Sequence, residues 1–249
     1  MQPIVKLQDI SLNYQSPDTE TEAIKNLTLS VNQGEFISIV GPSGCGKSTL
    51  LSIISGLLSP SSGSVIKSPS LKTGYMLQKD HLFEWRTILD NTLLGLEIKG
   101  LLTEENIAYA NELLDRYGLG EFKNHRPSEL SGGMRQRAAL IRTLAIRPEI
   151  LLLDEPFSAL DYQTRLFVSD EIGTIIKKEH KTAILVTHDI AEAVSLSDKI
   201  YVLSSRPSVI KSNHEIHLSI ENRTPMRSRE APEFKDYFNT IWKELDFIE

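Results

Sequence analysis

The stretch Gly41-Pro42-Ser43-Gly44-Cys45-Gly46-Lys47-Ser48-Thr49 has the spacing G-x-x-x-x-G-K-[ST] of a phosphate-binding loop. In such a loop, backbone N–H groups curl around the phosphates of a nucleotide. We expect the Lys47 amine to reach the β- and γ-phosphates and the Ser48 hydroxyl to bind Mg²⁺. An apolar segment, Phe36 to Val40, precedes the loop, and a helical stretch, Lys47 to Leu58, follows it. This strand-loop-helix order is the context that the motif requires, and it predicts an α/β fold.

Two further apolar segments end in polar residues that suit a phosphate site. Ile150 to Leu153 is followed by Asp154 and Glu155, and Ala183 to Val186 is followed by Thr187 and His188. Both segments are typical of buried parallel strands, whose carboxyl ends meet where ligands bind in open α/β sheets. We expect Asp154 to join the Mg²⁺ shell, Glu155 to orient or deprotonate the attacking water, and His188 to contact the γ-phosphate. Taken alone, the two acids are also consistent with a solvated strand end, and the histidine with a structural role.

A second phosphate-binding motif is suggested by the run Leu130-Ser131-Gly132-Gly133-Met134-Arg135-Gln136-Arg137. Ser131, Gly132 and Gly133 can open a helix whose first N–H groups face a phosphate. An ordinary helix start that needs no ligand is the alternative interpretation. The run lies in a helical part of the chain, beyond easy reach of Lys47 of the same molecule.

The spacing of apolar residues between Leu82 and Ile146 is typical of helices and predicts a mostly helical insert between the first and second core strands. Thr103 can cap a helix that ends near Gly118. The apolar positions of that helix recur at helical spacing and are Ile107, Ala110, Leu113, Leu114 and Tyr117.

The two ends of the chain have their own patterns. Val5 to Tyr14 and Ala23 to Val31 alternate like strands around a polar loop, Gln15 to Glu22, and predict a small antiparallel sheet that flanks the nucleotide. Near the other end, Val209 to Ile210 and Glu215 to Leu218 are short strand candidates.

The last part of the chain predicts a polar loop, Glu221 to Pro232, followed by a helix. The apolar residues of this helix share one stripe and are Phe234, Tyr237, Phe238, Ile241, Trp242 and Leu245. Such a stripe either packs on its own domain or covers a partner.

The 249-residue chain has an ordinary globular composition, with 40% hydrophobic and 24% charged residues and a net charge of −6. Its Lys and Arg residues are scattered, which argues against a general nucleic-acid-binding surface. The single cysteine, Cys45, cannot form an internal disulfide, so we interpret it as a small loop residue in a reducing cytosol. No secretory signal is visible in Met1 to Ile10, and no apolar run approaches the roughly 18 to 20 residues that span a bilayer. If the protein serves a membrane process, we expect another chain to cross the membrane.

Together these motifs resemble those of the ATP-binding subunit of an ABC transporter, over nearly the whole chain. In that family the run Leu130 to Arg137 is the signature motif, and His188 matches the switch histidine. Gln78 matches the glutamine that contacts Mg²⁺ and the attacking water. Asp161, in Ser158-Ala159-Leu160-Asp161, matches the D-loop, and Tyr14 matches the aromatic residue that stacks on adenine. Without the other motifs, Gln78 would be interpreted as an ordinary loop residue and Tyr14 as an ordinary strand residue.

The resemblance implies one domain with a P-loop NTPase, RecA-like core. Residues 1–81 and 147–220 form this core with its antiparallel β subdomain, residues 82–146 form the helical subdomain, and residues 221–249 form a C-terminal extension. The implied cofactors are ATP and Mg²⁺. The residues implied to contact the nucleotide are Tyr14, Gly41 to Thr49, Ser131 to Gly133 and Asp161. The residues implied to hold the metal are Ser48, Gln78 and Asp154.

The resemblance also implies that two ATP molecules are sandwiched in a head-to-tail dimer with two-fold symmetry. The dimer is a homodimer or a pair of different ATPase subunits, and Ser131 to Gly133 of one subunit complete the site of the other. ATP-driven closure is then passed to transmembrane permease subunits. This places the protein at the cytoplasmic face of the cell membrane as a peripheral subunit, with no nucleic acid partner.

The segment Leu82-Phe83-Glu84-Trp85-Arg86-Thr87 is similar to a Leu-x-Pro-Trp-x-Thr stretch of importer ATPases of the nitrate, sulfonate, taurine and bicarbonate group, with Glu84 in place of the proline. Phe83 and Trp85 fit a permease contact and the core of the insert equally. The Ser205-Arg206-Pro207 turn and the closing helix resemble the same group. We therefore expect an importer subunit, fed by an extracytoplasmic solute-binding protein.

Two alternatives to an importer stay open. The first is an exporter ATPase, and the second is a soluble ABC ATPase that acts in translation or DNA repair. The translation-type proteins carry two ATP cassettes and the repair-type proteins a long coiled-coil insert, whereas this chain has one set of motifs and no such insert.

Overall fold

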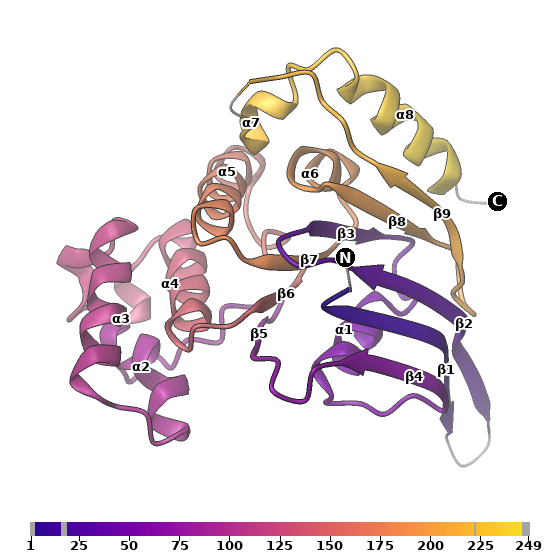
Figure 1. Ribbon diagram of the computed structural model, residues 1–249. Coiled ribbons are helices and arrows are strands. Elements are labelled where there is room, and N and C mark those ends of the chain that lie inside the picture. Colours follow the sequence, from indigo (N-terminus) through magenta and orange to yellow (C-terminus); the bar gives the residue numbers. More distant parts are fainter. Residues whose placement is uncertain (1–2, 16–18, 222, 246–249) are drawn as a thin grey trace.

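The computed structural model describes residues 3–15, 19–221 and 223–245 of the chain. Its centre is a six-stranded sheet with the strand order β5-β6-β7-β3-β8-β9, in which only β9 runs antiparallel to its neighbour (Figure 1). The strands span β3 Phe36–Val40, β5 Thr73–Met76, β6 Ile150–Asp154, β7 Thr182–Thr187, β8 Lys199–Leu203 and β9 Ile210–Glu215. The predicted parallel strands at the phosphate loop, at Asp154 and at His188 are confirmed as β3, β6 and β7.

Alternate residues of the central strands face two different cores, as the two-residue period of a strand requires. Ile150 and Leu152 of β6 join the core shared with helix α1 (Lys47–Ser55) and the small antiparallel sheet. Leu151 and Leu153 join the core shared with helices α4 (Gly132–Ala145) and α5 (Tyr162–Lys178). Because both faces of the central sheet are covered, these strands are apolar at successive positions rather than at alternate ones.

The predicted antiparallel sheet is present and has three strands in the order β2-β1-β4. They span β1 Val5–Gln15, β2 Glu20–Val31 and β4 Ser62–Lys67. The expected loop from Gln15 to Glu22 is shorter than predicted, because β1 includes Gln15 and β2 begins at Glu20; residues 16–18 lie outside the described part. Helix α1 is enclosed between this sheet and the central sheet (Figure 1).

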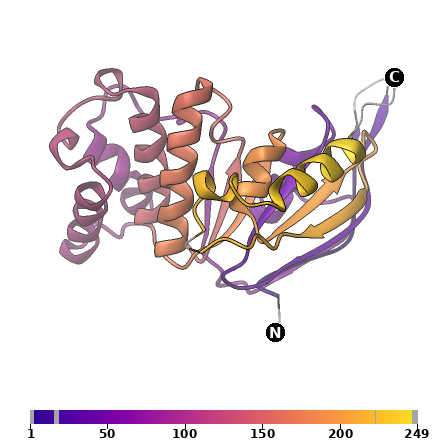
Figure 2. The same cartoon turned by 90° about the horizontal axis from the view of Figure 1, so that it is seen from above.

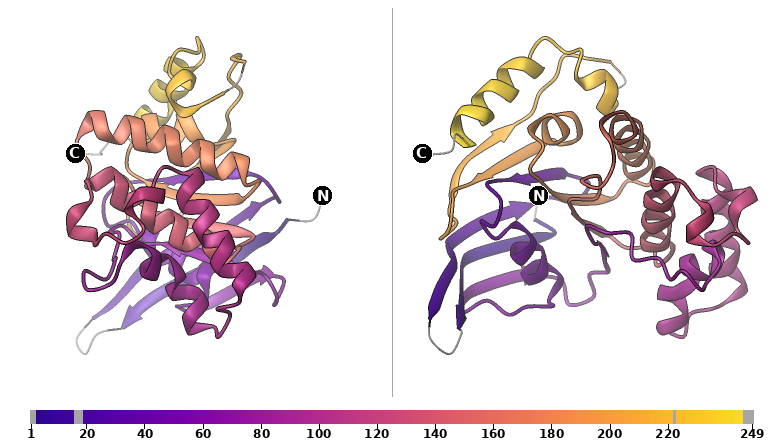
Figure 3. Two further views of the ribbon diagram at one scale, coloured as in Figure 1. Left: turned by 90° about the vertical axis from the view of Figure 1, so that its left-hand side faces the viewer. Right: turned by 180° about the vertical axis from the view of Figure 1, so that it is seen from behind.

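The helical subdomain stands at one end of the molecule (Figures 1 and 3). It consists of α2 Ile88–Ile98, α3 Glu104–Arg116, two short 3₁₀ turns at Gly120–Phe122 and Pro127–Glu129, and α4. Thr103 caps α3 as predicted, by accepting a hydrogen bond from the Asn106 N–H at 3.3 Å. The predicted position of the insert was wrong by one strand, since β5 precedes it in the central sheet. With only four residues, β5 is too short to show a pattern.

The C-terminal part differs from the prediction in two places. The two short strand candidates are not strands themselves: a single strand, β9, runs between them from Ile210 to Glu215 and includes only one end residue of each. The expected loop from Glu221 to Pro232 contains a short helix, α7 (Pro225–Ser228), whose cap is the Thr224 hydroxyl. The predicted last helix is confirmed as α8 (Phe234–Leu245), which lies across β8, β9 and helix α6 (Ile190–Leu196) (Figure 2).

Helix α8 packs its apolar stripe on its own domain. Ile241 is fully buried in a core with Val40, Ile190 and Val202, and Phe234, Tyr237 and Phe238 pack against that core. Packing on the parent domain, one of the two interpretations of this helix, is therefore confirmed for these residues, whereas Trp242 of the same stripe stays 52% exposed. None of the helices in the described ranges is both long and apolar enough to cross a bilayer.

Candidate nucleotide site

The phosphate loop joins the carboxyl end of β3 to the first turn of α1. Gly44 and Gly46 have φ values of +74° and +113°, a region in which a side chain would strain the backbone. Helix α1 begins at Lys47 without a side-chain cap, so its first N–H groups are left to a ligand. A helix start of this kind is suited to a phosphate group.

The side chains around the loop make a cationic cavity. Lys47 is 5% exposed, and its Nζ donates to the carbonyls of Gly41 at 2.9 Å and Pro42 at 3.0 Å. The cavity has a volume of about 220 Å³ and is lined by Ser43, Gly44, Gly46 to Thr49, Glu155 and Arg206. Cys45 points away from it, is 1% exposed, and has a thiol pKa raised by burial. Its packing is that of a small loop residue.

A carboxylate and a hydroxyl meet beside this cavity. The Ser48 hydroxyl donates to Asp154 Oδ1 at 2.8 Å, and the Tyr75 hydroxyl lies 3.5 Å from Oδ2. Burial is the main cause of the raised pKa of Asp154, which is 8% exposed. No group of three or more His, Cys, Asp or Glu side chains within the described ranges is placed to hold a metal. Mg²⁺ is commonly held by one or two carboxylates together with substrate phosphates, so this pair fits it.

Two polar side chains converge on the carboxylate of Glu155, the residue after the end of β6. His188 Nδ1 lies 3.1 Å from Glu155 Oε2, and Gln78 Nε2 lies 3.4 Å from the same oxygen. Gln78 Nε2 also lies 3.3 Å from the Ser158 hydroxyl. The backbone of Glu155 has a φ of +43°, which is uncommon for a residue with a side chain and is often found at functional sites. These contacts can position a water molecule next to a carboxylate.

Beneath this group lies a second acid, which the sequence analysis missed. Glu192 on α6 is 4% exposed, and burial raises the pKa of its carboxyl to about 7. It shares a small cavity with Glu155, Ser158 and His188, and its backbone N–H donates to Asp189 Oδ1 at 3.0 Å. The predicted acids Asp154 and Glu155 lie at a strand end, whereas Glu192 lies inside a helix, where a lone glutamate gives no signal.

Tyr14 and Arg206 lie at the edge of the cavity. The Tyr14 hydroxyl is 3.1 Å from the Thr49 hydroxyl, and its side chain is 45% exposed, which leaves it open to a base. The Arg206 guanidinium donates to the Gly44 carbonyl and brings a second cation to the loop. Arg206 was noted in sequence only as part of a turn, because its contact spans 162 positions.

The remaining predicted residues form a separate surface. Ser131 caps α4 by accepting from the Met134 N–H at 3.3 Å, and Asp161 caps α5 by accepting from the Thr164 N–H at 3.1 Å. Hydrogen bonding to Thr164 lowers the pKa of the Asp161 carboxyl. A Cβ atom on Gly132 would lie 3.2 Å from Leu160, so the two segments adjoin. Within the described part of the chain, Ser131, Gly132, Gly133 and Asp161 are not among the residues that line the Lys47 cavity.

Comparison with known proteins decides the family. Residues 24–158, more than half of the chain, match the family described as ABC transporter. The chain belongs to the ABC transporter family. It is a nucleotide-binding ATPase subunit of the kind coupled to transport, as predicted.

Individual relatives support this family assignment over nearly the whole length. The chain is 48% identical to the uncharacterized ABC transporter ATP-binding protein YtlC of Bacillus subtilis, with 96% of this chain and 95% of that protein covered. It is 37% identical to the nitrate import ATP-binding protein NrtD of Synechocystis, with 95% and 93% covered. A dimeric structure of the ATP-binding cassette MJ0796 in a post-hydrolysis state, bound to ADP and Pi, superposes with a TM-score of 0.72 at 34% identity, covering 86% of this chain and 99% of that one. The predicted fold is confirmed.

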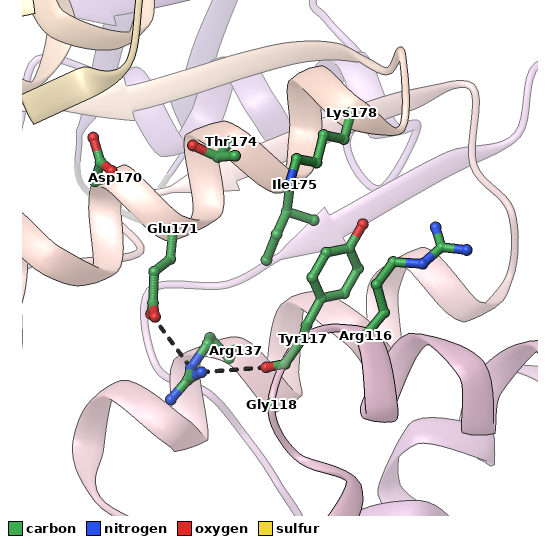
Figure 4. A pocket seen from close by; sticks show the side chains of 9 residues that line it. All are labelled: Arg116, Tyr117, Gly118, Arg137, Asp170, Glu171, Thr174, Ile175 and Lys178. Atoms are coloured by element: carbon green, nitrogen blue, oxygen red, sulfur yellow. Dashed lines mark hydrogen bonds and ion pairs between the residues drawn. The ribbon is translucent and has the colours of Figure 1, made fainter. Parts of the chain in front are cut away.

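A larger cavity of this ABC subunit, about 430 Å³, lies away from the phosphate loop (Figure 4). It is at the joint between α3, α4 and α5. Arg137 bridges the joint, with one guanidinium nitrogen 3.4 Å from Glu171 and another donating to the Tyr117 carbonyl at 3.2 Å. The Tyr117 hydroxyl donates to Glu179 at 2.7 Å, and burial is the first cause that raises its pKa to about 12. These contacts fasten the helical subdomain to the core.

The segment after Gln78 is anchored to helix α4. Leu82 is buried in the core shared with helices α4 and α5. Trp85 is 71% exposed and stacks on Phe83, with ring centroids 4.7 Å apart. The interpretation of Trp85 as core is therefore wrong. Arg135 of α4 forms ion pairs with Asp80 at 2.8 Å and with Glu84 at 2.9 Å. Glu84 thus ties the exposed segment to α4.

Proposed function

We propose that this subunit energises an ABC importer for a small anion or organic solute, such as nitrate, sulfonate, taurine or bicarbonate. One observation carries the proposal. The residues that suit phosphate binding and hydrolysis meet around Lys47 and Glu155, whereas Ser131 to Gly133 lie on a different surface. The similarity to a nitrate import protein favours import over export. An exporter ATPase is the second candidate function.

In the proposed site, ATP lies on the phosphate loop with its base against Tyr14. Lys47 and Arg206 neutralise the phosphates, and the N–H groups at the start of α1 bind their oxygens. Ser48, Asp154 and Gln78 would hold Mg²⁺, which would neutralise charge that develops on the phosphate oxygens. Asp154 serves in its ionised form, and the Ser48 hydroxyl that now donates to it is close enough to share the same ion.

Glu155 is the proposed base of the hydrolysis. Its carboxylate accepts a proton from the water that attacks the γ-phosphorus, while the amide of Gln78 holds that water in line; the bond from the γ-phosphorus to the bridging oxygen breaks, and ADP leaves with that oxygen. His188 now contacts Glu155, and in the proposed reaction it turns to the γ-phosphate and stabilises its charge. The strained backbone of Glu155 keeps the carboxylate at the end of β6.

Ser131 to Gly133 are proposed to complete the ATP site of a second ATPase subunit. The start of α4 offers N–H groups to a phosphate that its own chain does not bring near. The related MJ0796 cassette, bound to ADP and Pi, is a dimer, which supports the same arrangement here. The dimer is proposed to be a homodimer or a pair with a related ATPase subunit.

The helical subdomain is proposed to contact the permease through Phe83 and Trp85. Closure of the dimer moves α4, and the ion pairs of Arg135 with Asp80 and Glu84 pass that movement to the exposed segment. The subunit then sits on the cytoplasmic face of the membrane, without nucleic acid partners, and an extracytoplasmic solute-binding protein delivers the solute.

The test is purification of the tagged chain from detergent-solubilised membranes. We expect a multi-spanning permease to be retained with the wild-type protein and lost with Trp85→Ala. Ile98→Ala is the matched control, because Ile98 is an equally exposed apolar residue of the same subdomain, at 77%. Recovery of ribosomes or DNA in place of a permease would overturn the proposal.

A further inference from the structure

A small cavity lies between the start of the phosphate loop and helix α8. It has a volume of about 160 Å³ and is lined by Gly41 to Ser43, His188, Ile190, Trp242 and Leu245. Most of this lining is apolar. In another protein, an apolar cavity of about 150 Å³ binds benzene, so this volume suits a single aromatic ring. The cavity is not accounted for by ATP, because its far wall is the C-terminal helix.

The wall formed by α8 is held firmly in place. Ile241 anchors the helix in the core, and Glu244 accepts from His214 of β9, with a distance of 3.0 Å to His214 Nε2. Trp242 stacks on Phe238 with an interplanar angle of 15°, yet it remains 52% exposed. A large aromatic ring is therefore fixed beside the phosphate loop with about half of its surface open.

The position of the signature motif indicates which side chain could fill this cavity. This choice of side chain rests on the composite ATP site proposed above. Gly132 adjoins Leu160, which is followed by Asp161 and then by Tyr162, the first residue of α5. A second copy that brings its Gly132 to the phosphates at Lys47 also brings its Tyr162 to the same loop. Tyr162 is 66% exposed, and the cavity shares Gly41 to Ser43 with that loop. The cavity is thus continuous with the proposed dimer surface.

We propose that Tyr162 of a second copy of this chain inserts into the cavity and packs against Trp242. Helix α8 then forms part of the interface that ATP closes, and two-fold symmetry makes the contact twice. Aromatic rings in such a pair add stability beyond the area that they bury. The C-terminal helix is thereby placed to report, and to stabilise, the closed state of the two ATP sites.

The chain offers a direct reporter, because its only two tryptophans are Trp85 and Trp242. In a Trp85→Phe, Glu155→Gln protein, Mg²⁺ and ATP are added while molar mass and tryptophan emission are measured. We expect a shift of Trp242 emission to shorter wavelength and a loss of acrylamide quenching, both in step with the monomer-to-dimer transition. A dimer with unchanged emission would overturn this inference and leave the composite site standing. A monomer at saturating ATP would overturn both.

A double-mutant cycle on the dissociation constant of the ATP-bound dimer tests the pair itself. In the Glu155→Gln background, Trp242→Ala and Tyr162→Ala should each weaken the dimer by about tenfold, and the double variant by little more than either one. Tyr162 is exposed, so its replacement leaves the fold of the monomer intact. Leu57→Ala, at a site that is 75% exposed, is the control and should have no effect. Additive losses, or no loss, would contradict the contact.

Discussion

Replacing the buried Glu192 by glutamine should change how the stability of this protein depends on pH. The carboxyl has an ordinary pKa of 4.5, which burial raises to about 7 in the folded chain. Between these values the unfolded chain has released a proton that the folded chain still holds, so the free energy of unfolding falls as pH rises through this window. The difference between the two pKa values corresponds to about 3 to 4 kcal/mol at roughly 1.4 kcal/mol per pKa unit. Well above pH 7 the buried carboxyl is ionised in the folded chain as well, and the free energy of unfolding is lowered by the full cost of burying this charge.

Glutamine keeps the shape and hydrogen-bonding groups of the side chain but does not titrate. Urea unfolding of the nucleotide-free protein at several values between pH 5 and pH 8 measures the effect. Glu192→Gln should gain stability relative to the wild type as pH rises, by about 2 to 3 kcal/mol across this range. Glu121→Gln, at an exposed carboxylate, is the control and should follow the wild type. Parallel pH profiles for Glu192→Gln and the wild type would refute the argument.

Three other substitutions probe the ATP site and the C-terminal helix. Tyr14→Ala should raise the KM for ATP by about tenfold with little change in kcat, because stacking acts mainly on the bound ground state; a kcat effect alone in steady-state kinetics would count against stacking. Glu155→Gln should keep ATP binding, lose at least about 10²-fold in kcat and accumulate an ATP-bound dimer, whereas normal phosphate release would exclude Glu155 as the base. Ile241→Ala should lower the free energy of unfolding by about 2–5 kcal/mol, while the exposed Lys243→Ala stays within about 0.5 kcal/mol of the wild type in the same urea assay.

The parts of the site that lie at strand ends could be predicted from the sequence. A buried parallel strand is apolar throughout, so the first polar residue after it marks the edge where ligands bind. This reasoning located Asp154, Glu155 and His188 around the phosphate loop, and their contacts agree with it. Helical spacing of apolar residues located helices α3 and α8, whose apolar stripes face the protein core, although Trp242 of α8 stays 52% exposed.

The elements that were missed have weak or short patterns. Strand β4 is mostly exposed and shows no alternation, and β5 contains a glycine among its four residues. Strand β8 is apolar along Ile200 to Leu203 and carries a usable signal that the sequence analysis did not take up. Arg206 and Trp242 reach the phosphate loop only through the fold, because partners that are distant in sequence leave no local pattern.

The central claim is that each chain supplies half of two ATP sites. Lys47→Ala removes the phosphate side of a site, and Ser131→Arg blocks the signature side. Each variant alone should be inactive, but a mixture forms heterodimers in which Lys47 of one chain faces Ser131 of the other. We predict that ATP hydrolysis appears on mixing and follows the fraction of heterodimer. Activity no greater than the sum of the separate variants, with heterodimers shown to be present, would contradict the shared site.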